Sequence, residues 1–308
     1  MKILIAYDGS TSADAAIEDL QRAGLPQQAE ALVVCVSDGG LPSSEDTGKM
    51  EKDSEGSWRS KVAEAEKLAE KASERIRSYF PGWTISIEAL WGSPAKVIMD
   101  TSARWHPDLL VVGSHGRSRV ARLFLGSVSL ELIHKASCSV RVARRGEPST
   151  SSRPIRIVIG YDGSLAAQAL IRSIATRSWP AKTEAQIISA VQTLVPGTAA
   201  TALEASTYAQ EPAYSVIREA DERERARLRN VVEDSATSLR QAGLIATSAV
   251  VDGDPRDAIL TAAEAPQADA IFVGARGLGR MERLLLGSVS THVVMHAHCS
   301  VEVVRQTA

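Results

Sequence analysis

Residues 109–116 read Leu-Leu-Val-Val-Gly-Ser-His-Gly, and after nine intervening residues the pair Gly126-Ser127 begins an apolar helical pattern. A short apolar run that ends at a glycine is typical of a buried strand. Glycine lets the backbone approach a ligand closely, and a Gly-Ser pair at a helix start presents backbone N–H groups and a hydroxyl to an anion. The stretch therefore predicts a strand, a phosphate-binding loop and a helix N-terminus in succession.

The same pattern occurs a second time in the chain. Gly274-Ala-Arg-Gly277 also follows an apolar run, and Gly287-Ser288 begins the next helical pattern. Three further segments recur in the same order, so we expect a duplicated domain, with one copy at 1–146, the other at 154–308 and a Gly/Pro/Ser-rich linker at 144–153. The recurring segments are 3–10 with 157–164, 92–94 with 253–255, and 138–140 with 299–301.

Each half alternates short apolar runs with helical patterns, which is typical of right-handed βαβ units. The fold class expected is α/β, with two tandem doubly wound domains. Each would be a five-stranded parallel sheet of order 3-2-1-4-5 with helices on both faces, and its ligand crevice would lie at the carboxyl ends of strands one and four. Strands are expected at 3–7, 31–36, 84–90, 109–112 and 140–143, and again at 157–161, 185–191, 247–251, 270–273 and 301–304. Helices are expected at 11–23, 58–80, 95–103, 128–136 and 219–241, and loops at 38–56 and 192–212.

Composition limits the partners of the chain. Its 308 residues are 44% hydrophobic and 23% charged, and the formal net charge of -2 provides no global field for nucleic acid or a membrane surface. No signal peptide is recognisable, and no apolar run reaches the roughly 18–20 residues of a membrane span. The three cysteines form no CxxC pair, which favours a reducing cytoplasm over a disulfide framework or a zinc site.

Two aspartates stand at the expected switch points. Asp8 and Asp162 each end a first strand and precede Gly-Ser. Either carboxylate can accept hydrogen bonds from a ribose or base, or the segment merely turns the chain and caps the next helix. Together with the glycine motif of the adjacent strand, the pattern favours ligand contact for the aspartates, whereas Ser10 and Ser164 are expected to be helix caps.

These motifs resemble those of the universal stress protein family. The resemblance is carried by residues 112–118 with 125–128 and by 273–278 with 286–289, and it covers essentially the whole chain in tandem form. The glycine spacing, the first-strand aspartate and the Gly-x-Pro turn resemble the ATP-binding branch. The resemblance implies that ATP or a related adenine nucleotide, with or without Mg²⁺, is bound in a stress-response protein.

The family contacts fall on matching positions in each half. The aspartate would lie near ribose and base, the valine that ends the second strand near adenine, the fourth-strand residues near the nucleoside, and the rest around the phosphates. The first set is Asp8, Val36, Val112, Gly113, Gly116, Gly126, Ser127, Val128 and Ser129, and the second is Asp162, Val191, Val273, Gly274, Gly277, Gly287, Ser288, Val289 and Ser290.

The second copy departs from the family pattern. Ala275-Arg276 stands where the first copy has Ser114-His115, and 278–279 lack the polar pair of 117–118, so the first site is the closer match. His115 is open to two interpretations, as a phosphate contact or a solvated loop residue. His292, His296 and His298 have a partial metal-ligand spacing, but an exposed helix face is favoured over a metal site.

Three functions stay open at this point. The first is an ATP-binding sensor or scaffold without dedicated catalysis. The second is a slow ATP hydrolase or phosphotransferase that uses the same pocket, although no general base is recognisable near the phosphates. The third is an interaction module that binds no nucleotide. The resemblance also implies that the domains pair through their last strands, within one chain and with a homodimer as an additional form.

Overall fold

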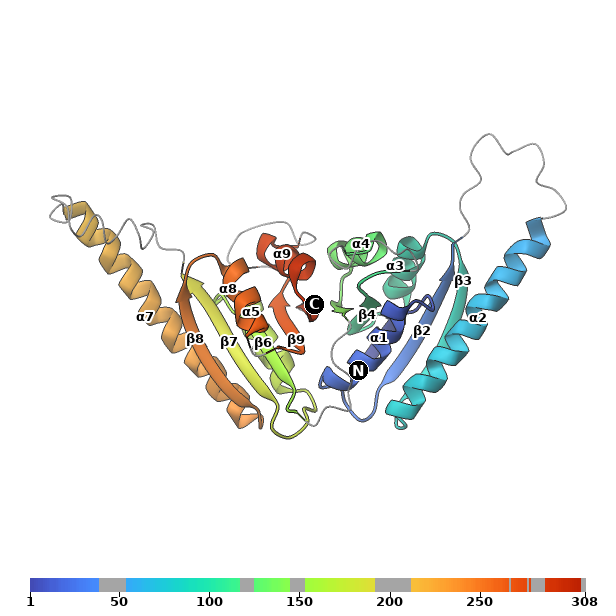
Figure 1. The fold of residues 1–308 in the computed structure, drawn as a ribbon, viewed down its shortest axis with the longest axis horizontal. Helices are drawn as coiled ribbons and strands as arrows, with labels where there is room; N and C mark the ends of the chain where they lie inside the picture. Colours follow the sequence, from blue (N-terminus) through green and yellow to red (C-terminus); the bar gives the residue numbers. More distant parts are fainter. Residues whose placement is uncertain are drawn as a thin grey trace.

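The chain folds into two α/β halves joined edge to edge (Figure 1). A computed structural model describes residues 1–38, 54–116, 125–144, 153–191, 212–265, 267–275, 277 and 286–305, with side chains from Trp58 in the first long helix and from Arg218 in the second. Outside these residues lie most of the linker expected at 144–153, most of the loops expected at 38–56 and 192–212, and the arginines within or after the two glycine motifs, at 117, 119, 122, 276, 280 and 283.

The first half follows the predicted alternation. Strand β1 ends at Ala6, two residues before Asp8, and β4 ends on Gly113. The elements are β1 Lys2–Ala6, α1 Thr11–Asp19, a 3₁₀ turn Leu20–Arg22, β2 Glu30–Ser37, α2 Ser54–Tyr79, β3 Thr84–Trp91, α3 Pro94–Trp105, β4 Leu109–Gly113, α4 Ser127–Lys135 and β5 Ser139–Ala143.

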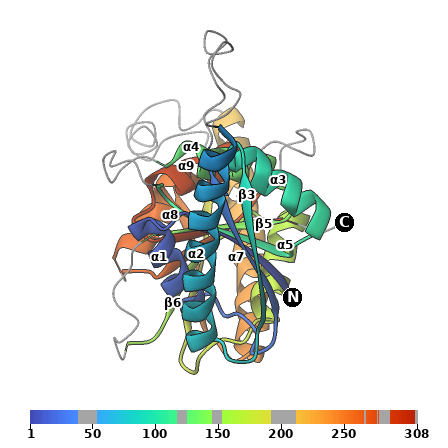
Figure 2. The same cartoon turned by 90° about the vertical axis from the view of Figure 1, so that its right-hand side faces the viewer.

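The second half repeats that order. The elements are β6 Arg156–Gly160, α5 Leu165–Ala175, β7 Glu184–Val191, α7 Pro212–Gln241, β8 Ile245–Asp252, α8 Pro255–Glu264, β9 Ala270–Gly274, α9 Ser288–His296 and β10 Ser300–Val304. The α2 and α7 helices lie at opposite ends of the molecule, and Figure 2 shows α2 in front of the sheet.

Three predicted helix boundaries were wrong. Helix α2 begins at Ser54 and α7 at Pro212, before the starts expected at 58 and 219. The Ser-Glu-Gly-Ser start of α2 lacks the apolar period by which a helix is recognised, whereas Ala213, Val216 and Ile217 of α7 have that spacing and were missed. The helix expected over 11–23 instead changes to a 3₁₀ turn at Leu20, shortly before Gly24 takes a φ of 63°.

All ten strands form one sheet, in the order β3-β2-β1-β4-β5-β10-β9-β6-β7-β8. Each half therefore has the predicted order 3-2-1-4-5, and the neighbours within a half are parallel. The halves meet where β5 pairs antiparallel with β10. This confirms the doubly wound fold and shows that the last strands join the two halves within one chain.

Alternate residues of each strand face different cores. In β1, Leu4 packs toward α3 and α4, whereas Ile3 and Ile5 pack toward α1 and α2. The first of these cores crosses the junction, because it also includes Val158 and Val303 of the second half. One face of the sheet therefore has a core shared by both halves, which holds the ends of β1 and β4 in place.

Candidate nucleotide site

A cavity of about 200 Å³ lies at the carboxyl ends of β1, β2 and β4, beside the N-terminus of α4. Its wall is formed by all of the residues expected from the sequence in the first half: Asp8, Val36, Val112, Gly113, Gly116, Gly126, Ser127, Val128 and Ser129. These residues come from separate segments of the chain. The fold therefore brings them together where the winding of the sheet reverses.

Asp8 both shapes the turn and lines the cavity. Its Oδ1 accepts the backbone N–H of Ser10 at 2.9 Å, and Ser10 Oγ in turn accepts the N–H of Ala13 at 3.1 Å. Ser10 is therefore the predicted N-cap of α1. The other oxygen, Oδ2, approaches the glycine loop so closely that a Cβ at Gly116 would lie 3.2 Å from it. The carboxylate and the loop thus form opposite sides of one narrow site.

The glycine loop is attached to the start of α4 by two hydrogen bonds. Gly126 N–H donates to the carbonyl of Ser114 at 2.8 Å, and Ser129 Oγ donates to the carbonyl of Gly113 at 2.7 Å. Gly126 is the N-cap of α4 and has no side chain to satisfy the N–H groups of the first turn. Those groups and the positive end of the helix dipole suit an anion at this end of the cavity.

His115 provides an imidazole in the same wall. Its Nδ1 lies 2.9 Å from Ser114 Oγ, and its Nε2 is buried without a hydrogen-bond partner. A buried polar atom without a partner is costly unless a ligand or water satisfies it. Of the two interpretations left open by the sequence, the structure favours His115 facing the cavity over a solvated loop residue.

The cavity also has lining residues that the motifs did not indicate. Apolar Val34 and Ile98 face it, and Ile98 comes from α3, outside the glycine motif. Tyr7 lines it too and donates its hydroxyl to Asp14 Oδ1 at 2.7 Å; burial and this contact raise the pKa of Tyr7. Tyr7 and Val34 lie in the apolar runs that predicted the first two strands, whereas no motif indicated Ile98. Ala6, Ala13 and Pro94 complete the wall.

The second half repeats the backbone arrangement. Gly287 N–H donates to the carbonyl of Ala275 at 2.8 Å, and Ser290 Oγ donates to the carbonyl of Gly274 at 2.6 Å. A Cβ at Gly277 would lie 2.6 Å from Asp162 Oδ2. Val191 ends β7, Val273 is the penultimate residue of β9, and Ser288 and Val289 begin α9. Ser164 caps α5 as predicted, by accepting the N–H of Ala167.

The remaining candidates have structural roles or none. His292 and His296 stack at 4.0 Å on α9, and no group of three or more potential metal ligands occurs among the described residues. The three cysteines are buried and form no disulfide bond. Trp83 is in the core, whereas Trp58 is 40% exposed. No helix in the described part of the chain has the length and apolar composition needed to cross a bilayer.

The universal stress protein family model matches residues 1–144 and, separately, residues 155–305. The chain belongs to the universal stress protein family. It is 27% identical over 261 residues to a universal stress protein of Mycobacterium tuberculosis, which covers 80% of this chain and 76% of that one. A Methanocaldococcus jannaschii universal stress protein is 28% identical and covers 47% of this chain and 82% of its own length.

A solved structure extends the similarity to the whole fold. A universal stress protein from Archaeoglobus fulgidus matches with a TM-score of 0.64 at 19% identity, covering 99% of this chain and 98% of that one. At this identity the match concerns the fold alone. The tandem arrangement expected from the sequence is therefore confirmed, while the ligand and the role of each site residue stay predictions.

Proposed function

We propose that this universal stress protein binds ATP or a related adenine nucleotide in each half and acts as a nucleotide-responsive sensor or scaffold. The observation that supports the proposal is the cavity of the first half. Nine residues expected from the family resemblance line it together with an imidazole whose Nε2 has no partner. Segments so far apart in sequence converge on one cavity with an apolar side and an anion-binding side.

The two sides of the cavity suit the two ends of a nucleotide. Val34, Val36 and Ile98 provide an apolar surface for a base, and Asp8 offers carboxylate oxygens to hydroxyl or amino donors. The phosphates would lie at the glycine loop and the first turn of α4, where N–H groups and the helix dipole stabilise negative charge. The corresponding residues of the second half, from Asp162 to Ser290, would hold a second nucleotide.

The proposal concerns binding and not catalysis. Asp8 is the one carboxylate among the described residues that line the cavity, and it lies beside the backbone of the glycine loop. A single carboxylate would hold Mg²⁺ only together with phosphate oxygens and water, so Mg²⁺ would arrive with the nucleotide. If the wild type shows steady ATP turnover that disappears in an Asp8→Ala/Asp162→Ala double variant, the function is ATP hydrolysis and not sensing.

Two further parts of the proposal concern location and assembly. Three buried cysteines without a disulfide bond fit a reducing compartment, and we propose a cytoplasmic location. Pairing of the halves within one chain occupies both last strands. An additional homodimer would therefore have to use another surface of the molecule.

The binding proposal can be tested on the purified chain. Denatured protein should release an adenine nucleotide detectable by mass spectrometry, and calorimetric titration with ATP should give two equivalents per chain. A Cβ at Gly126 would meet its nearest neighbours at 3.5 Å, so Gly126→Val should fold but obstruct the anion-binding end. We expect one equivalent in Gly126→Val, one in Gly287→Val, and none in the double variant.

Two results would contradict the proposal. The absence of any adenine nucleotide in both the released fraction and the titration would leave the interaction module as the function. Unchanged stoichiometry in Gly126→Val, with a circular dichroism spectrum like that of the wild type, would show that the site lies elsewhere.

A further inference from the structure

The junction between β5 and β10 has approximate two-fold symmetry. Val301 pairs with Val142, Glu302 with Arg141, and Val303 with Val140. In the sequence repeat Cys138-Ser-Val-Arg141 corresponds to Cys299-Ser-Val-Glu302. Arg141 and Glu302 are therefore equivalent positions that face each other at the centre of the junction, and the two copies place opposite charges there.

The contacts around this centre are the same on both sides. Arg144 N–H donates to Ser300 Oγ at 3.1 Å, and Arg305 N–H donates to Ser139 Oγ at 3.1 Å. The guanidinium of Arg144 reaches a carbonyl near the end of α9, and that of Arg305 reaches one near the end of α4. Two identical halves could form the same contacts, so these contacts do not distinguish a first half from a second.

The centre itself consists of four side chains of alternating charge. Arg141 and Glu302 are both 0% exposed, and Arg141 Nη1 lies 3.3 Å from Glu302 Oε2. Asp19 on α1 accepts two bonds from Arg141, at 2.6 and 3.1 Å, and Arg177 pairs with Glu302. Each half thus contributes one ion pair, and the two pairs meet with Arg141 of the first against Glu302 of the second.

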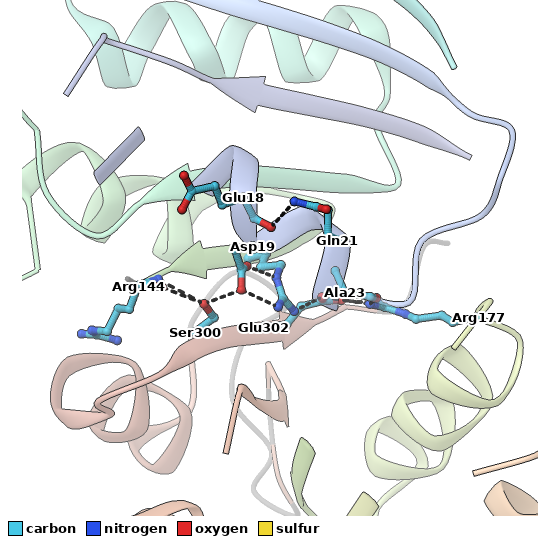
Figure 3. A network of polar contacts seen from close by, with 9 residues as sticks. Glu18, Asp19, Gln21, Ala23, Arg144, Arg177, Ser300 and Glu302 are labelled. Carbon is cyan, nitrogen blue, oxygen red and sulfur yellow. Dashed lines mark hydrogen bonds and ion pairs between the residues drawn. The ribbon is translucent and has the colours of Figure 1, made fainter. Parts of the chain in front are cut away.

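Two further hydrogen bonds connect the halves around this centre. Ser300 Oγ donates to Asp19 Oδ1 at 2.8 Å, and Arg177 Nη1 donates to the carbonyl of Ala23 at 2.9 Å. Figure 3 shows Ser300 between Asp19 and Arg144, on the strand that carries Glu302. Burial alone would lower the pKa of Arg141, but the carboxylates of Asp19 and Glu302 raise it. Opposite charges therefore face each other at the centre only when a first half meets a second half.

We propose that the charges at positions 141 and 302 make this junction selective. The last strand of a first half pairs with the last strand of a second half, from the same chain or from another copy. It does not pair with the last strand of another first half. Pairing two first halves would place Arg141 against Arg141 in a buried register, and pairing two second halves would place Glu302 against Glu302. Each Arg141 or Glu302 would keep the counter-charge of its own half, Asp19 or Arg177, but would lose the opposite charge across the junction and face a like charge instead, which disfavours such assemblies.

The intact chain offers a test by reversal of sign. In the wild type, Arg141→Met should lower the Tm by roughly 10 °C, because it leaves Asp19 without its guanidinium partner. In a Glu302→Arg background the same change should raise the Tm, because it removes a buried like-charge pair. If Glu302→Arg does not fold, Glu302→Gln serves instead, and Arg141→Met should then cost less than in the wild type. An equal loss of Tm in both backgrounds would overturn the proposal.

A second test measures selectivity directly. A protease site introduced between Glu147 and Ser152 allows the folded chain to be cut, and cut protein is mixed with cut, ¹⁵N-labelled protein until the halves exchange. Native mass spectrometry should then show only pairs of a first half with a second half. In Arg141→Met/Glu302→Met, pairs of like halves should appear as well.

The matched control is Arg144→Met, which removes one of the symmetric contacts. It should weaken the junction and leave the pairing selective. If the Arg141→Met/Glu302→Met variant still forms only unlike pairs, the selectivity resides in other contacts, such as the ion pair of Arg22 with Asp269, and the proposal fails. Pairs of like halves in the cut wild type would overturn it as well.

Discussion

The two halves of this protein are alike where their backbones form the candidate ligand sites and unlike where they meet. Both glycine loops are held by a serine hydroxyl that donates to the carbonyl of the glycine ending a strand, at 2.7 Å in the first half and 2.6 Å in the second. At the junction, by contrast, Arg141 corresponds to Glu302. A site made of backbone groups tolerates few changes in geometry, whereas an antiparallel strand pair accepts any side chains that complement each other.

The difference continues into the helices that follow β1 and β6. Asp19 and Ser173 each lie eleven residues after the strand-end aspartate of their half. Asp19 neutralises Arg141, while in the second half the counter-charge to Glu302 comes from Arg177. Each half therefore neutralises its buried charge with its own residue: Asp19 is the last residue of α1, whereas Arg177 follows the end of α5.

The largest expected effect comes from removing Asp19. Asp19→Ala should lower the free energy of unfolding by about 3–5 kcal/mol, because it leaves the buried guanidinium of Arg141 with one carboxylate fewer. Ser173→Ala is the matched control in the second half and should cost well under about 1 kcal/mol. Urea denaturation followed by tryptophan fluorescence measures both. Equal losses of unfolding free energy in the two variants would show that Asp19 stabilises the protein no more than Ser173 does, which would contradict the comparison.

The next effect is a loss of stability at acidic pH, which is caused by a carboxyl group at the junction. Burial favours a raised pKa for Glu302, but Arg177 and Arg141 lower it below its ordinary value of 4.5. A carboxyl whose pKa is lower in the folded state stabilises the fold above its unfolded pKa, and this contribution is lost as the pH falls through the folded pKa. The Tm of the wild type should therefore drop steeply below about pH 4.5.

Glu302→Gln should reduce the slope of Tm against pH in that range, because its side chain does not titrate. The exposed Glu264→Gln is the control and should keep the slope of the wild type. Calorimetric scans between about pH 3 and 7 provide the measurement. If the Glu302→Gln variant is as acid-sensitive as the wild type, protonation of Glu302 does not cause the loss of stability in acid.

A smaller effect compares the two sites. A Cβ at Gly277 would lie 2.6 Å from Asp162 Oδ2, whereas one at Gly116 would lie 3.2 Å from Asp8 Oδ2. Gly277→Ala should therefore displace its aspartate and weaken nucleotide binding at the second site by about tenfold, or roughly 1.4 kcal/mol. Gly116→Ala should weaken the first site less. Titrations in Gly126→Val and Gly287→Val backgrounds isolate the two sites, and the reverse order would contradict the comparison.

The smallest effect should be equal in the two halves. Ser10 and Ser164 cap α1 and α5 through the same bond, to Ala13 N and Ala167 N, each at 3.1 Å. Ser10→Ala and Ser164→Ala should each cost about 1 kcal/mol of stability. Urea midpoints that differ by more than the error of the measurement would mean that the shared backbone arrangement is less equal than the distances indicate.

Much of the fold followed from local patterns. The positions of all ten strands, their order within each half and the cap residues could be predicted, because apolar periodicity and Gly-Ser spacing act over a few residues. The polar first turn of α2 could not be predicted, because it shows no such period, whereas the start of α7 was missed although Ala213, Val216 and Ile217 have helical spacing. In the candidate site, motif residues such as Gly126 were predicted, whereas Ile98 was not, since it lies outside the motifs and reaches the cavity only through the packing of α3.

The sequence by itself determined the duplication, the α/β class and the two glycine loops, because each is recognised from motifs of a few consecutive residues. Only the tertiary structure revealed the unpartnered Nε2 of His115 and the four alternating charges at the junction. Ser300 and Asp19 are 281 residues apart and still share a hydrogen bond of 2.8 Å. No periodicity encodes such a contact, because it exists only once two complete sheets have joined edge to edge.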